Sequence, residues 1–204
     1  MSKNEYIIHG TQPVNLINIL KDGFINNEPI KKYRTMLKTS PKLIFTQLIY
    51  PDIPNETKQN PHWLQSCIVL KKELLKDYPF FVTPVGSFDA KEKQIILQSN
   101  GNLSKMPSIV KLKKYINKTL ETSLSTDFMH SHEILFDKKI PLDKYCKCII
   151  MYDYNLTDKK EKAKHLEIIE LASKLNIPVI TRKNSMRNKG INNFIEAINS
   201  ITKS

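Results

Sequence analysis

Short apolar runs recur along this sequence, and each is only a few residues long. They occupy residues 5–9, 43–45, 67–70, 80–82, 94–97, 134–136, 148–152 and 177–180. Runs of this length, rich in Ile, Val and aromatic residues, are typical of β-strands with one or both faces buried. None approaches the roughly 20 apolar residues of a membrane-spanning helix. We therefore expect a fold organised around a sheet, with no membrane segment.

Segments with helical spacing lie between these runs. Thr11 is a candidate N-cap for a helix that Gly23 would end. Apolar residues within 109–120 also have helical spacing. Near the end of the chain, Asp158 begins a capping-box-like pattern, and 191–201 reads as a last helix. The sequence thus predicts both helices and strands.

The chain has 204 residues, which suits one domain or one domain with a modest addition. Its character changes after the run at 148–152, where a β-α-β-α pattern closes the sequence. We predict a main domain over residues 1–152. Residues 153–204 would form a helix-strand-helix extension packed on the same domain.

The net charge of +12 raises the possibility of an anionic partner. Of the 32 basic residues, however, only Arg34, Arg182 and Arg187 are arginine, the usual reader of bases. A lysine-rich surface favours weak, salt-sensitive attraction to polyanions over sequence-specific recognition. The composition is also what an AT-rich genome imposes on any protein. A basic, non-enzymatic nucleic-acid-binding protein therefore stays open as an alternative.

The three cysteines suggest neither a metal site nor a disulfide framework. No second Cys or His pair stands at ligand spacing from Cys146 and Cys148. We expect reduced thiols, no metal and no disulfide-linked partner. The N-terminus has no apolar signal region, so we expect an intracellular protein, cytoplasmic or nuclear.

Two polar residues stand at the ends of apolar runs far apart in the sequence. His9 closes the first run and is followed by Gly10 and Thr11, whereas Glu133 opens the run at 134–136. Such groups are more often ordinary strand-end residues than catalytic ones. A functional interpretation depends on whether the two stretches meet in the fold.

The motifs around these residues resemble those of the ADP-ribosyltransferases. His9-Gly10-Thr11 ends the first strand, and an asparagine-led helix, Asn15 to Gly23, follows it. Glu133-Ile134-Leu135-Phe136 is then similar to the strand that carries the family glutamate, with 140–152 following. The pattern resembles the His-Tyr-Glu branch, which includes the poly(ADP-ribose) polymerases, over roughly residues 5–152.

This resemblance implies an α+β fold with a split, mostly antiparallel central sheet and flanking helices. It implies transfer of ADP-ribose from NAD to a macromolecular acceptor, with release of nicotinamide and without a metal. His9 would orient the ribose, and Gly10 and Thr11 would bind the nicotinamide end of NAD. Glu133 would hold a ribose hydroxyl and stabilise the positive charge that develops as the glycosidic bond breaks.

The aromatic platform and the acceptor are less defined. Tyr50 is the favoured stacking residue and Tyr33 the alternative. Arg34 and its basic surroundings at 31–42, like the lysine-rich segment at 105–118, suit the NAD pyrophosphate or an anionic acceptor. Ser131, two residues before the glutamate, argues against arginine as the acceptor, which leaves a protein or nucleic-acid acceptor open. A catalytically weak relative that only binds NAD or ADP-ribose is a further alternative.

Overall fold

The computed structural model describes residues 4–26, 44–51, 66–83, 97–99, 113–114, 133–136, 138–153, 156–186 and 190–201. Within these ranges the strands of the main sheet are β1 (Tyr6–Thr11), β3 (Ile44–Ile49), β4 (Ser66–Leu70), β5 (Phe80–Thr83), β6 (Leu97–Ser99), β7 (Glu133–Phe136), β9 (Cys146–Tyr152) and β10 (Val179–Arg182). Two short strands, β2 (Phe24–Ile25) and β8 (Ile140–Pro141), pair separately. The helices are α1 (Pro13–Asp22), α2 (Leu74–Asp77), α4 (Leu142–Tyr145), α5 (Lys159–Lys174) and α6 (Gly190–Ser200), with a 3-10 turn at Asn184–Met186.

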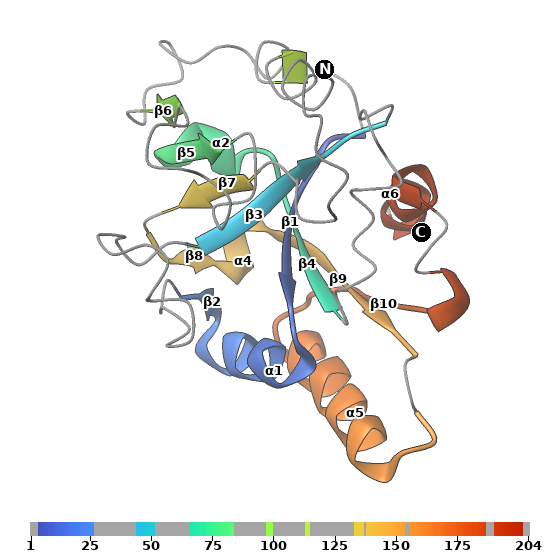
Figure 1. Cartoon of the computed structure of the whole chain (residues 1–204). Coiled ribbons are helices and arrows are strands. Elements are labelled where there is room, and N and C mark those ends of the chain that lie inside the picture. Colours follow the sequence, from blue (N-terminus) through green and yellow to red (C-terminus); the bar gives the residue numbers. More distant parts are fainter. Residues whose placement is uncertain are drawn as a thin grey trace, which may run out of the picture.

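The main sheet has eight strands in the order β10-β9-β4-β1-β3-β7-β5-β6 (Figure 1). Its described ladders are antiparallel except for the parallel pair of β9 and β10. The expected fold class, α+β with a central sheet, is confirmed. Among the described residues, no helix has the length and apolar character needed to cross a membrane.

Strand β3 spans a division in the sheet. Its second half pairs with β1, in the register Tyr6 with Ile49 to Ile8 with Gln47. Its first half pairs instead with β7, from Ile44 to Thr46. Beyond Ile8, the residues of β1 pair only with β4 on its other side among the described ladders. The two halves of the sheet therefore diverge where His9 follows Ile8.

The core is densest in the middle strands. Side chains of the first half of β1, of β4 and of most of β9 are almost completely buried, including Ile7, Ile68, Val69, Ile149 and Ile150. Strands buried in this way are apolar throughout rather than alternating, because both faces are covered. Helices α1 and α5 lie side by side at one end of the sheet, and α6 lies apart from them (Figure 1).

Helix α1 forms largely as its sequence predicts. Pro13 occupies the first turn, and Leu16, Ile17 and Leu20 form its buried side. Gly23 ends the helix at φ 72°, in the left-handed region that glycine tolerates, and its N–H donates to the Ile19 carbonyl.

The predicted N-cap of α1 is wrong. Gln12 holds the cap position and makes no side-chain cap bond. Thr11 is instead the last residue of β1 and remains paired with Ser66 in the ladder. Its backbone belongs to the sheet, so the helix can begin only after it.

The C-terminal residues continue the main sheet. Strand β10 pairs in parallel with β9, from Val179 with Ile149 to Arg182 with Tyr152, and α5 makes the crossover. The predicted start of α5 is confirmed, because the Asp158 carboxylate accepts from the backbone N–H groups of Lys160 and Glu161. Phe194 and other residues of α6 belong to the common hydrophobic core. The boundary at residue 152 stays a prediction.

Two further predictions fall mainly outside the described residues. Of the predicted helix at 109–120, the structure describes residues 113–114, which are helical. Of the predicted strand at 94–97, it describes Leu97, the first residue of β6.

Candidate functional site

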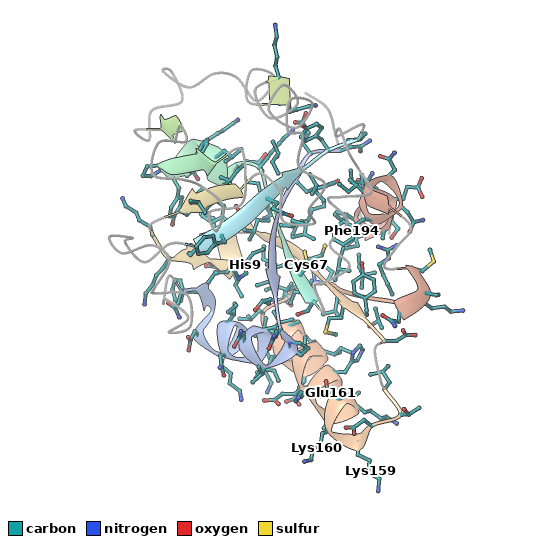
Figure 2. All side chains as sticks on the ribbon, in the orientation of Figure 1. His9, Cys67, Lys159, Lys160, Glu161 and Phe194 are labelled. Atoms are coloured by element: carbon teal, nitrogen blue, oxygen red, sulfur yellow. The ribbon has the colours of Figure 1, made fainter. Side chains whose placement is uncertain are left out.

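His9 lies where the ladder between β1 and β3 ends, near the middle of the sheet (Figure 2). Its ring is partly buried, and its Nδ1 is 2.8 Å from the carbonyl oxygen of Phe45. A carbonyl can only accept a hydrogen bond, so Nδ1 must carry the hydrogen. Burial lowers the pKa of His9, although the bond to Phe45 acts in the opposite direction. The ring is therefore neutral near pH 7 with Nε2 as an acceptor, which suits a ligand hydroxyl.

Gly10 and Thr11 continue β1 beyond this point. They pair with Cys67 and Ser66 of β4. The Ser66 hydroxyl is completely buried and donates to the Thr11 carbonyl at 2.7 Å. The C-terminal end of β1 is therefore held in place by β4. Its last three residues lie along the division of the sheet.

Glu133 is the first residue of β7, on the opposite side of β3. Its backbone pairs with Thr83 of β5, and the next residue, Ile134, pairs with Thr46 of β3. Strand β3 thus stands between β1 and β7. Because neighbouring strands are about 4.8 Å apart, the backbones of the His9 and Glu133 stretches lie on the order of 10 Å from each other. The fold brings the two predicted stretches into one neighbourhood despite their distance in sequence.

Tyr50 lies at the other end of the β1–β3 ladder. It follows Ile49, which pairs with Tyr6, so about four residues of β1 separate its level from His9. At about 3.3 Å per residue this is roughly 13 Å. Its side chain is 1% exposed, its pKa is raised by burial, and the Lys113 ammonium lies 4.8 Å from its ring centroid. The structure does not bring this ring to His9.

The remaining predicted site residues are not placed by the structure. Tyr33 and Arg34 lie outside the described residues, as does Ser131.

Phe45 is an aromatic residue of this region that the sequence reasoning missed. Its carbonyl holds His9, and its side chain is 37% exposed. Continuing the register of Ile8 with Gln47 puts Phe45 level with Gly10. The signal in the sequence is the apolar run at 43–45, which predicts a strand, whereas the family resemblance points to a tyrosine rather than to a phenylalanine.

Three buried ionisable groups of the core, Glu5, Cys146 and Cys148, lie in surroundings that do not favour catalysis. Glu5 is buried beside two ammonium groups, those of Lys113 at 2.9 Å and Lys72 at 3.6 Å. Burial raises the pKa of Cys146 and of Cys148 to about 12, which keeps both thiols protonated and weakly nucleophilic. No group of His, Cys, Asp and Glu side chains within the described ranges could hold a metal ion.

Comparison with solved structures shows a likeness in fold. One similar structure is Thermosipho africanus DarTG in complex with ADP-ribose, with a TM-score of 0.50 and 14% sequence identity. The match covers 86% of this chain and 49% of that chain, so this chain spans about half the length of its neighbour. The likeness does not support the narrower comparison with poly(ADP-ribose) polymerases. No family model and no curated protein matches the sequence.

Proposed function

We propose that this protein transfers ADP-ribose from NAD to a macromolecular acceptor and releases nicotinamide. The observation that carries the proposal is the division of the sheet at His9. There the neutral His9 ring lies at the end of the β1–β3 ladder. Only strand β3 separates it from β7, which begins at Glu133. The likeness in fold to a protein solved with ADP-ribose supports the same chemistry.

In the proposed reaction the bond between ribose C1′ and the nicotinamide nitrogen breaks. Its electron pair leaves with nicotinamide, and positive charge develops on the ribose. A nucleophilic atom of the acceptor then bonds to C1′ and loses its proton to solvent. His9 contributes by accepting a hydrogen bond from a ribose hydroxyl at Nε2, which fixes the sugar for attack. Glu133 stabilises the developing positive charge electrostatically.

Phe45 takes the stacking position in this proposal. It is an exposed aromatic ring on the residue that holds His9, whereas the Tyr50 ring is buried at the far end of the ladder. An aromatic face placed beside the opening of the sheet offers a surface for the nicotinamide ring.

A second candidate function is binding of NAD or ADP-ribose without turnover. It is favoured by the place of Tyr50, because the tyrosine predicted to stack on nicotinamide does not reach the candidate site, and poor stacking would slow turnover. In this case His9 and Phe45 would still bind NAD or ADP-ribose, but no nicotinamide would be released, with or without the Glu133 carboxylate.

The test follows release of nicotinamide from labelled NAD, with cell extract supplying acceptors. Wild type is compared with Glu133→Gln, which keeps size but removes the charge. The control is Glu167→Gln on α5, where the carboxylate forms an exposed ion pair with Lys21. Release that disappears only in Glu133→Gln supports the transferase. Binding of NAD without release supports the second candidate, and neither binding nor release by folded protein contradicts both.

A further inference from the structure

Two consecutive residues of β3 connect the halves of the divided sheet by contacts outside the regular ladder. The Phe45 carbonyl accepts from His9 on the β1 side at 2.8 Å. The Thr46 hydroxyl donates to the Ile134 carbonyl on the β7 side at 2.7 Å. These contacts lie where β3 changes its partner, because Thr46 ends the pairing with β7 and Gln47 begins the pairing with β1.

The contact made by Thr46 is shielded from water. Its side chain is 2% exposed, and Ile134 is completely buried. A hydrogen bond in such surroundings is not exchanged for water, and its loss leaves a buried carbonyl without this donor. The bond therefore fixes the position of the β7 backbone along its neighbour β3.

The residue held in this way directly follows Glu133. On the β3 side, the ladder between β3 and β7 ends at the pair of Thr46 and Ile134. Glu133 is thus the first residue beyond the last anchored pair on that side, although Thr83 pairs with it from β5. A shift at Ile134 would be passed to the neighbouring glutamate through a single peptide unit.

We infer that Thr46 is a positioning residue that sets the place of Glu133 relative to His9, an inference that rests on the proposed function. The preceding residue fixes His9, so one dipeptide of β3 sets both sides of the site. Because displacement of a reacting group by about 1 Å can cost 100-fold in rate, the hydroxyl affects turnover more than NAD binding.

Thr46→Val tests this inference, since valine keeps the shape and removes the donor. We expect kcat for nicotinamide release to fall by about 10- to 100-fold, with the KM for NAD almost unchanged. Thr46→Ser retains the hydroxyl and should restore most of kcat. If the valine variant does not fold, Thr46→Cys, a much weaker donor of similar size, should show the same loss of kcat.

Two other hydroxyls provide matched comparisons. Ser66→Ala removes a bond of the same 2.7 Å length, but that bond holds Thr11 on the binding side. We expect it to raise the KM for NAD rather than lower kcat. Ser200→Ala removes the exposed bond of Ser200 to the Ala197 carbonyl in α6 and should change neither constant.

The outcomes separate this inference from the function on which it rests. If Glu133→Gln abolishes release but Thr46→Val keeps the wild-type kcat, the positioning role is wrong and the function stands. Equal losses in Thr46→Val and Thr46→Ser would also overturn the role of the hydroxyl. If folded wild type releases no nicotinamide, both the function and the positioning role fail. A fall in kcat confined to variants without the hydroxyl supports both.

Discussion

At the scale of single residues, the candidate site depends on what holds each side chain. His9 is oriented by a backbone carbonyl rather than by a carboxylate, so no described neighbour in hydrogen-bond contact favours its charged form strongly. Phe45 offers an exposed ring on the residue that provides this carbonyl. The two residues can therefore be tested separately. At His9 the tested property is the protonation of the ring, and at Phe45 it is the aromatic surface.

Protonation of His9 should destabilise the folded protein. Its pKa is lowered below the ordinary value of 6.5, mainly by burial. Below that value the unfolded chain binds a proton that the folded chain does not, so its contribution to stability is fully present above pH 6.5 and is lost as pH falls. We expect the free energy of unfolding of wild type to drop more between about pH 8 and pH 5.5 than that of His9→Asn.

Urea unfolding at both pH values measures this difference. His165, whose pKa is also lowered by burial, is common to both proteins, so its contribution cancels. Parallel losses of stability in the two proteins would contradict a buried, neutral His9.

Loss of the Phe45 ring should weaken NAD binding. Stacking of a base on an aromatic side chain is worth about 1–3 kcal/mol on alanine substitution, so Phe45→Ala should raise the KM or Kd for NAD by about 5- to 150-fold. Phe45→Tyr keeps the ring and should stay near wild type. Phe24→Ala is the matched control, because Phe24 is a comparably exposed ring at 42% on β2. Equal effects at the two positions in titrations with NAD would argue against stacking on Phe45.

At the scale of elements, short local signals define the helices that support the sheet. Helix α1 begins at a proline and ends at Gly23, whereas α5 begins at the carboxylate of Asp158. The two helices pack together, and an exposed ion pair between Lys21 and Glu167 joins them at 2.8 Å. An exposed ion pair adds little to the free energy of unfolding, so the stability of these helices comes mostly from their end residues and their buried faces.

Asp158→Ala should destabilise the protein by about 1 kcal/mol, because two backbone N–H groups at the start of α5 lose their acceptor. Asp158→Asn keeps an acceptor oxygen and should recover most of this loss. Glu170→Ala removes an exposed ion pair with Lys174 and should cost much less stability than Asp158→Ala, because solvent screens the pair. Thermal unfolding of the three variants measures the order, and an equal cost for Asp158→Ala and Glu170→Ala would contradict the cap.

At the scale of the whole molecule, the C-terminal residues complete the sheet and its core. Strand β10 covers one edge of β9, and α6 contributes Phe194 and Ile198 to the common core. The Tyr6 hydroxyl donates to Asn199 at 2.5 Å, which joins the first strand to the last helix. These contacts connect the two parts that the sequence divides at residue 152.

A chain ending at residue 152 should therefore fail to fold. It would leave an apolar face and the edge of β9 open, which promotes association between chains. We expect loss of the soluble fraction and of cooperative unfolding, compared with the full chain under the same conditions. A folded, monomeric 1–152 fragment would contradict this prediction and would support 153–204 as a separable extension.

The sequence alone predicted many of the elements, and its family resemblance implied a split, mostly antiparallel sheet, but it did not specify which strands pair. Apolar runs located strands such as Glu133–Phe136 and Cys146–Tyr152 to within a few residues, and Gly23 and Asp158 marked helix ends, because these signals depend on near neighbours in the chain. The cap assigned to Thr11 failed because pairing with Ser66 kept that residue in the sheet.

Only the tertiary structure decided which residues meet. Strand pairing joins residues far apart in sequence, and a short apolar run does not specify its partner or register. The change of partner between Thr46 and Gln47 has no local signature, yet it opens the sheet at His9. The same register puts Tyr50 at the far end of the ladder and Phe45 level with Gly10, so it is the pairing of strands, rather than residue type, that favours Phe45 as the proposed stacking residue.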